Sequence, residues 1–157
     1  MKKALVITLT FILLFSLSAC GKGQKSTYTV NPRPELKLVA QYPSREMMGA
    51  GTVQPNKSVD IALCLEKDTG IDPITGNANR FILEECIDGV WYTIPRPDMD
   101  FTDDGYTPTV GNPVKQTCRI QGLVQHPGHY RILKEVIIGR GEALQREYYA
   151  AEFDVTN

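Results

Sequence analysis

The chain has 157 residues, with 17 basic and 18 acidic side chains and a net charge of −1. This length supports one domain with its own hydrophobic core, because typical domains hold about 100 to 150 residues. The nearly even charge argues against a nucleic-acid partner, which would need a clustered basic face.

The first nineteen residues have the features of a secretory signal peptide. Lys2 and Lys3 give a cationic start, residues 4–15 form an apolar run, and small residues precede Cys20. The run is short for a permanent transmembrane helix, so we expect residues 1–19 to be a cleaved signal. Removing Lys2 and Lys3 from the 17 basic residues leaves 15 against 18 acidic ones, a net charge of −3.

The end of this segment, Leu17-Ser18-Ala19-Cys20, resembles the lipobox of bacterial lipoproteins. The resemblance implies that the Cys20 thiol carries a diacylglycerol and that two or three acyl chains of the palmitate type enter the bilayer. Each buried methylene adds about 0.8 kcal/mol, so several chains anchor durably where one holds only marginally. We therefore expect a lipid-anchored protein on the extracytoplasmic face of the cell membrane. The alternative is an ordinary signal peptide with an accidental cysteine.

The next segment, residues 20–34, is polar, with Gly21 and Gly23 early and Pro32 and Pro34 late. This composition is typical of a flexible tether, which cannot bury a core. Fully extended, such a tether would reach up to roughly 50 Å. The expected organisation is therefore signal peptide 1–19, tether 20–34 beginning at the lipidated Cys20, and one folded domain over residues 35–157.

In the folded part, apolar side chains recur at every second position, and no sustained helical stripe occurs. This alternation predicts β-strands over residues 36–42, 59–65, 80–87, 90–94, 114–120, 130–138 and 148–155. Asp88-Gly89 is a strong signal for a two-residue hairpin and would place Ile87 opposite Val90 and Cys86 opposite Trp91. About seven short strands without helices predict an all-β fold, a β-sandwich with Greek-key connections.

Several motifs follow one another in a recognisable order. They are Leu83-Glu84-Glu85, Asp88-Gly89-Val90-Trp91-Tyr92, Asp100-Phe101-Thr102-Asp103, Pro127-Gly128-His129-Tyr130-Arg131-Ile132 and Tyr148-Tyr149-Ala150-Ala151-Glu152-Phe153. Over roughly residues 55–155 this succession resembles the bacterial immunoglobulin-like domain family of lipoproteins and cell-surface proteins. The resemblance implies an antiparallel sandwich of about seven strands. It also implies that the hydroxyl of Tyr130 bonds back to the backbone at a corner of the sandwich.

Three further cysteines, Cys64, Cys86 and Cys118, follow Cys20. Outside the cytoplasm disulfides can persist, but an odd number allows at most one pair within the chain, and spacing does not select it. The alternative is that some or all of them are small buried apolar side chains. No cysteine follows Tyr130, so the inter-sheet disulfide of antibody domains is missing. We therefore expect Trp91, together with Tyr130, to fill much of the core.

Two clusters are candidate metal or ligand sites. Asp98, Asp100, Asp103 and Asp104 form an acidic loop as a possible binding site. Within it Asp100, Thr102, Asp104 and Gly105 fall at the early spacings of a calcium loop, but the twelfth position is Gly111 rather than the bidentate glutamate and no helices flank the loop. His126 and His129 are the only histidines, and zinc would need further ligands from elsewhere. A solvated loop is the favoured interpretation of the histidines, and the family resemblance implies a structural role for Asp100-Phe101-Thr102-Asp103.

Catalytic signatures are missing from the sequence. Ser26, Ser44 and Ser58 do not stand in a nucleophile-elbow setting, and no phosphate-binding glycine loop is present. Glu84 and Glu85 are neighbours on a predicted strand, so their side chains should point to opposite faces. We therefore expect neither an enzyme nor a cofactor.

The sequence thus predicts a non-enzymatic, membrane-anchored lipoprotein that serves as a binding or structural module of the cell envelope. Its partners would be the bilayer, through acylated Cys20, and an envelope protein or ligand. One alternative is a proteinase-inhibitor-like domain that uses the loop over residues 95–113. Another is a metal or small-ligand sensor that uses residues 98–104 with His126 and His129.

Overall fold

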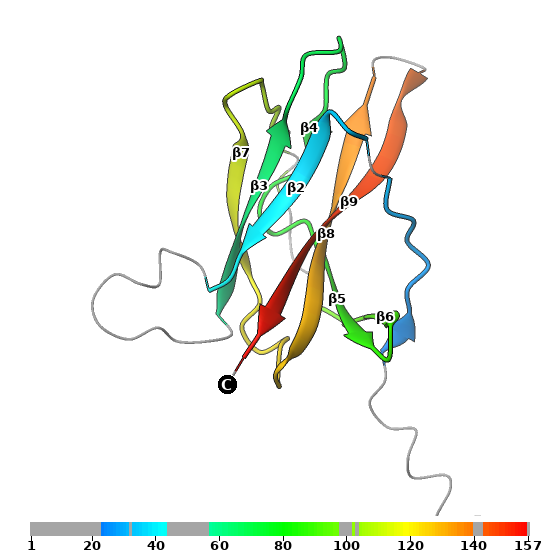
Figure 1. The fold of residues 1–157 in the computed structure, drawn as a ribbon, viewed down its shortest axis with the longest axis vertical. Coiled ribbons are helices and arrows are strands. Elements are labelled where there is room, and N and C mark those ends of the chain that lie inside the picture. The colour runs from blue at the N-terminus through cyan, green and yellow to red at the C-terminus, as the bar shows by residue number, and fades with distance from the viewer. Residues whose placement is uncertain are drawn as a thin grey trace, which may run out of the picture.

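The computed structural model describes residues 23–31, 33–43, 57–97, 102, 104–139 and 143–156. These residues form two antiparallel β-sheets packed face to face, with no α-helix among them (Figure 1). None of them forms a helix with the length and apolarity needed to cross a bilayer. The strands are β1 (Gln24–Lys25), β2 (Leu36–Gln41), β3 (Ser58–Leu65), β4 (Ile74–Thr75), β5 (Ile82–Ile87), β6 (Val90–Thr93), β7 (Val114–Arg119), β8 (Gly128–Ile138) and β9 (Gln145–Val155).

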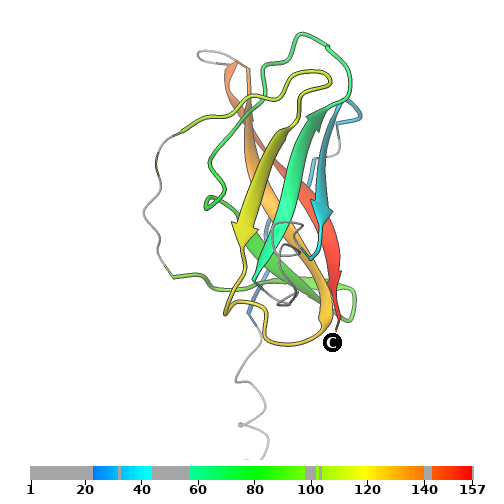
Figure 2. The same ribbon diagram turned by 90° about the vertical axis from the view of Figure 1, so that its left-hand side faces the viewer.

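The large sheet has the order β1-β6-β5-β8-β9, with the short β4 pairing with β8 beyond the end of β5. The small sheet has the order β2-β3-β7 and faces the viewer in Figure 2. The chain crosses from one sheet to the other after β1, after β3, after β6 and again after β7. These crossings make a Greek-key sandwich, so the predicted all-β architecture is confirmed.

The β5–β6 hairpin has the geometry that its sequence predicts. Asp88 and Gly89 both have positive φ, at 52° and 77°, as a type I′ turn requires. The turn sets the register, which pairs Ile87 with Val90 and Cys86 with Trp91. This register decides which side chains of β5 and β6 face the core.

The core lies between the sheets and takes alternate residues from every long strand, as strand geometry requires. Tyr130 is 1% exposed and belongs to this core. Cys118 is also buried there, and among the described residues Cys64, Cys86 and Cys118 are all free thiols. Cys118 therefore serves as a small apolar side chain. Other core members are Leu36, Leu38, Val59, Ile61, Leu63, Leu83, Ile120, Ile132, Val136, Tyr149, Ala151 and Phe153.

Trp91 does not belong to this core, so the prediction that it fills much of the interior is wrong. Leu83 faces inward, and alternation along β5 therefore turns Cys86 outward. Trp91 pairs with Cys86 and lies half-buried on the same outer face, against Arg131 and His129. The hairpin register fixes this orientation, and the aromatic side chains of Tyr130, Tyr149 and Phe153 fill the core instead.

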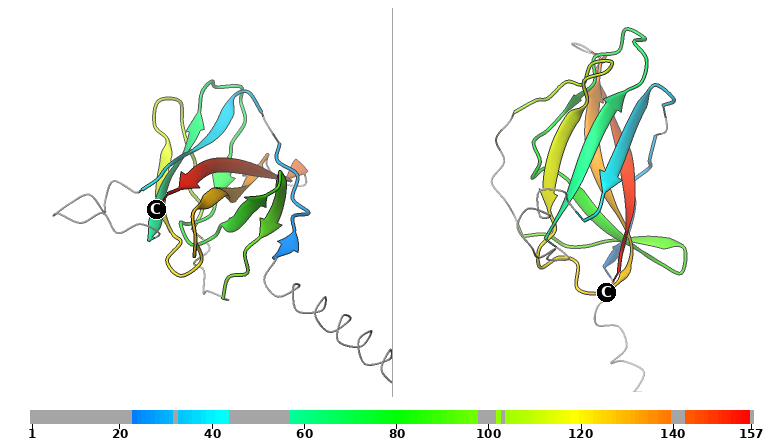
Figure 3. Two further views of the ribbon diagram at one scale, coloured as in Figure 1. Left: turned by 60° about the horizontal axis from the view of Figure 1, so that its bottom comes forward. Right: turned by 60° about the vertical axis from the view of Figure 1, so that its left-hand side comes forward.

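The N-terminal segment also differs from its prediction. Composition predicts a flexible tether over residues 20–34, but residues 23–31 lie on the large sheet and are named the strap here. At one end β1 pairs with β6, and the backbone N–H of Ser26 donates to the carbonyl of Trp91 at 2.9 Å. Figure 3 shows β1 beside β6 when the molecule is seen from below. A polar composition cannot reveal that the edge strand β6 offers free backbone groups for pairing.

The other end of the strap reaches β9. Val30 bridges to Tyr148, and the N–H of Asn31 donates to the Tyr148 carbonyl at 3.0 Å. The ring of Tyr28 packs edge-on against that of Tyr148, with 4.9 Å between their centroids. In Figure 1 the strap, in blue, runs along the large sheet before the chain enters β2. The strap is therefore part of the folded domain.

Candidate functional site

Neighbouring glutamates on β5 place a charged group on each face of the large sheet, as alternation predicts. Glu84 points outward and receives a hydrogen bond from Arg131, whereas Glu85 points inward toward Tyr130. Two clusters are built around them. The first is the outer cluster of Glu84, Arg131, Trp91 and Thr93, and the second is the end pocket described below.

The outer cluster is held by a buried ion pair. The Nε of Arg131 donates to Glu84 at 2.7 Å, and the two side chains are 9% and 0% exposed. The Thr93 hydroxyl donates to the other oxygen of Glu84 at 3.2 Å, and the Arg131 guanidinium lies 4.2 Å from the centre of the Trp91 ring. Each charge is thus paired, and the cation is stacked on an aromatic face. These contacts hold β5, β6 and β8 together. They also leave neither charged group free to take part in a reaction.

The two histidines do not form one site. His129 lies on the outer face, where Nδ1 is 2.7 Å from Asp154 and Nε2 is 3.1 Å from Glu152. The hydrogen bond to Asp154 is the main cause of the raised pKa of His129. His126 lies at the end pocket instead, with Nε2 3.4 Å from Glu85. Among the described residues, no three His, Cys, Asp or Glu side chains are grouped as a metal ion would need.

The end pocket lies between the β5–β6 hairpin and the connection from β7 to β8. It is a cavity of about 360 Å³. The small sheet has three strands and leaves the β6 edge of the large sheet uncovered. The inner face of β6 therefore meets a loop rather than a strand. The side chains that give the pocket its character are Glu85, Tyr92, Ile94, Leu123, His126 and Tyr130.

Tyr130 forms the wall of this pocket and ties the loop to the sheet. Its hydroxyl donates to the backbone carbonyl of His126 at 2.9 Å, which is the corner bond that the resemblance implies. The same oxygen is 3.4 Å from Oε1 of Glu85. Burial is the main cause, with a contribution from the Glu85 charge, of a Tyr130 pKa raised to about 12. The phenol therefore stays neutral and acts as a donor.

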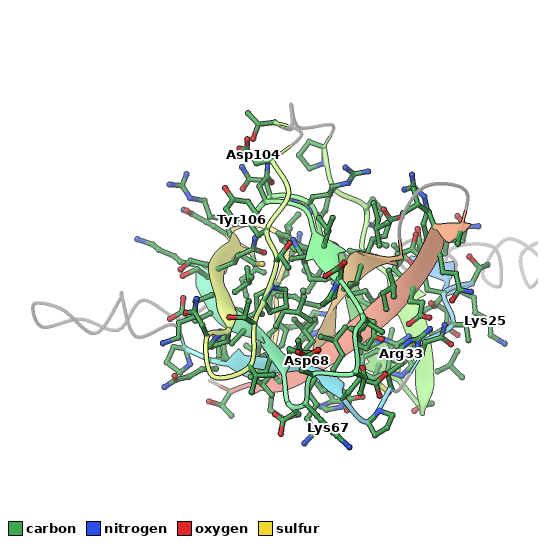
Figure 4. All side chains as sticks on the ribbon, turned by 90° about the horizontal axis from the view of Figure 1, so that it is seen from above. Lys25, Arg33, Lys67, Asp68, Asp104 and Tyr106 are labelled. Carbon is green, nitrogen blue, oxygen red and sulfur yellow. The ribbon has the colours of Figure 1, made fainter. Side chains whose placement is uncertain are left out.

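Only part of the acidic loop lies among the described residues. Asp98, Asp100 and Asp103 lie outside the described residues, and Asp104 is exposed and accepts a hydrogen bond from Thr102 at 2.7 Å. Just after it, Tyr106 forms a backbone bridge with Thr75. Figure 4 shows Asp104 and Tyr106 together on one flank of the molecule.

A buried lysine lies at the other end of the same inner face. Lys134 is 1% exposed, and its ammonium donates to the backbone carbonyls of Gly76 and Asn77 at 3.1 and 2.5 Å. Burial lowers its pKa to about 8, an effect that the nearby Cys118 partly offsets. The lysine thus closes the side of the sandwich by holding residues 76 and 77 against β8. In the sequence it stands in an apolar run, and nothing there shows which carbonyls it meets.

The end pocket was also missed at the sequence level. Glu85 could be assigned to the inner face by alternation, but His126 and Tyr130, which contact its carboxylate, lie 41 and 45 residues away in the chain. The signal that pointed toward it was the Gly-x-Tyr sequence at 128–130, which marks the corner where His126 meets the sheet. Cys20, the predicted lipidation site, lies outside the described residues.

The comparisons with known proteins agree with this architecture. The model of the bacterial Ig-like domain family matches residues 50–154, about two thirds of the chain. The search of curated proteins and the search of solved structures each found no match. The matched range contains β3 to β9 almost entirely, and therefore both sheets, the outer cluster and most of the end pocket. The chain belongs to the bacterial Ig-like domain family.

Proposed function

We propose that the protein is a non-enzymatic, lipid-anchored Ig-like module that is held close to the outer surface of the cell membrane. The lipobox-like sequence ending at Cys20 supports the anchor, and the Ig-like fold supports a binding or structural role. The observation that carries the proposal is the start of β1 at Gln24, four residues after Cys20. Four residues span at most about 14 Å, which is far less than a free tether of residues 20–34 would allow.

The short link from Cys20 to Gln24, called the leash here, is supported by a close approach of two backbone segments. At Gly23, an added Cβ would lie only 2.1 Å from the carbonyl oxygen of Thr93. Any larger residue would push β1 away from β6. Glycine is therefore required where the leash joins the sheet.

An ion pair secures the chain just beyond the strap, before β2 begins. Arg33 Nε donates to both carboxylate oxygens of Glu147, at 3.0 and 2.8 Å, and the Glu147 side chain is only 7% exposed. The Tyr149 hydroxyl also donates to Glu147 at 2.8 Å. Such charge-assisted hydrogen bonds are about twice as strong as neutral ones. A pull on the N-terminus would thus act on the sandwich itself.

The two alternative functions gain no specific support. An inhibitory loop would need to project freely, but Thr75 and Tyr106 exchange backbone hydrogen bonds at 2.9 Å in both directions. A sensor that combines both histidines would need them together, and His126 and His129 have separate partners. The described residues therefore favour a scaffold-like module over either alternative.

The anchor is tested by replacing Cys20 in cells that make the full chain. Wild-type protein should enter the membrane fraction and incorporate labelled palmitate, and Cys20→Ser should lose both. Cys64→Ser is the matched control, because it removes a thiol within the sandwich and should leave labelling unchanged. Equal labelling and membrane partition of the wild type and Cys20→Ser would overturn the proposal.

A further inference from the structure

The end pocket contains a carboxylate that is mostly buried and weakly paired. The Glu85 side chain is 16% exposed. Its nearest donors are the Tyr130 hydroxyl and His126 Nε2, each at the long distance of 3.4 Å. Within the described part of the chain, no lysine or arginine lies within 4.0 Å of it. A carboxylate removed from water in this way gains from an additional cation.

The walls of the pocket define what kind of cation fits. Apart from Glu85 and His126 the lining is uncharged. It combines the polar residues Thr93 and Gln125 with the larger side chains of Tyr92, Ile94 and Leu123, and Tyr130 is almost fully buried. A single carboxylate beside an aromatic ring and aliphatic side chains suits an organic cation better than a hydrated metal ion, which needs several oxygen ligands. A volume of about 360 Å³ is at the small end of ligand sites. The occupant must therefore be small and singly charged.

Among the described lysines and arginines none supplies such a cation, and His126, 3.4 Å from Glu85, is charged only when it is protonated. Lys25 pairs with Tyr92 across β1 and β6, yet it is exposed and is not among the lining residues. Figure 4 shows Lys25 at the periphery of the molecule. The site is thus open to a cation from outside.

We infer that the end pocket binds a small alkylammonium ion, with Glu85 as its counter-ion and Tyr92 as its aromatic wall. The ammonium group takes the free lone pairs of Glu85, and its alkyl part contacts Ile94 and Leu123. This inference stands whether or not Cys20 is acylated. An ammonium group can come from a free amine or from a phospholipid headgroup, and the test separates these two sources.

The first arm uses the full chain in a neutral detergent and ethylammonium chloride as the probe, with sodium chloride and ethanol as controls for ionic strength and for the neutral analogue. Methyl resonances of Ile94 and Leu123 should shift with saturation for ethylammonium alone. Glu85→Gln keeps the shape of the side chain and should weaken binding tenfold or more. The matched control is Glu152→Gln, which removes the same charge from the outer face and should bind as the wild type does.

The second arm places the full chain in nanodiscs of phosphatidylethanolamine or of phosphatidylglycerol. Shifts of the same methyl groups in phosphatidylethanolamine alone would assign the ligand to the lipid headgroup. Saturable shifts confined to the first arm would assign it to a free amine. A linear response to ethylammonium that sodium chloride reproduces, or equal binding by the wild type and a folded Glu85→Gln, would overturn the inference. An unchanged amide spectrum outside the pocket verifies the fold of each variant.

Discussion

Arg33 and Glu147 are 114 residues apart in the chain, yet the Nε of Arg33 donates to both oxygens of the Glu147 carboxylate. This pair joins the segment before the first long strand to the last strand of the domain. It places the strap and β9 in one folded unit.

Arg33→Ala should therefore loosen the strap. Hydrogen bonds to charged groups contribute about 1.5–3 kcal/mol, and we expect unfolding to become easier by that amount. Amide exchange of residues 24–31 should accelerate much more than that of β3. Lys37→Ala, which breaks the exposed pair with Glu66, is the control and should change stability by less than about 1 kcal/mol. Unchanged exchange in the strap would contradict the role of this pair.

Acid should weaken the same contact. The hydrogen bond from Arg33 lowers the pKa of Glu147, so the folded chain holds that carboxylate ionised to lower pH than the unfolded chain does. The stability it contributes is present above its ordinary pKa and is lost as pH falls through the lowered value. In urea unfolding followed over this range, Glu147→Gln should lose less stability than the wild type. Parallel curves for the two proteins would show that the pair is not coupled to folding.

The buried pair of the outer cluster should be costly to break. Glu84→Gln leaves Arg131 buried without a counter-ion, and we expect a loss of about 3–5 kcal/mol in the free energy of unfolding. The double variant Glu84→Leu with Arg131→Met should lose less than Glu84→Gln, because no charge is then left unpaired. Denaturant midpoints of the wild type, the single variant and the double variant measure these losses of stability. A double variant less stable than the single one would contradict the argument.

His129 should titrate above its ordinary pKa of 6.5 because Asp154 and Glu152 bind its ring. The stability that His129 contributes is fully present below its pKa in the unfolded chain. It is lost as pH rises through its higher pKa in the folded chain. Proton resonances of the imidazole give the value directly. Asp154→Asn should lower it more than Glu152→Gln does, since the bond to Asp154 is the shorter. An unchanged His129 pKa in both variants would show that these carboxylates do not raise it.

Lys134 should make the domain more stable as pH rises. Its pKa is about 8 in the folded chain and 10.5 in the unfolded one, so between these values the unfolded chain holds the proton that the folded chain has released. The free energy of unfolding then increases with pH. The difference between wild type and Lys134→Met, measured from about pH 7.5 to about pH 9.5, should grow in favour of the wild type. A constant difference would contradict the lowered pKa.

The alternation of apolar side chains was sufficient to predict the sandwich. Its period of two identified the long strands, and Asp88-Gly89 fixed the register of Cys86 and Trp91 because only a tight turn fits two residues of positive φ. The outer face of Trp91 follows from that register, whereas its residue type alone favours the core. An indole on the outer face is stable here because Arg131 stacks against it.

The strap and the end pocket could not be predicted in this way. Pairing of Gln24 with Thr93 depends on the free edge of β6, and the Glu85 pocket depends on one sheet being narrower than the other. Both are relations between segments far apart in the chain. Local composition and periodicity do not show which distant segments meet.

The only tryptophan of the chain lies on β6, the strand that β1 pairs with, and so reports how close the sandwich is held to the bilayer. The most direct test is energy transfer from Trp91 to dansyl-labelled headgroups in vesicles that carry the acylated protein. A flexible insert of about twelve residues between Lys22 and Gly23 adds roughly 20 Å of leash, while the same insert after Asn157 serves as the control. We expect transfer to be strong in the wild type and in the control, and to fall several-fold with the N-terminal insert. Equal transfer in all three proteins at equal membrane binding would contradict the short leash.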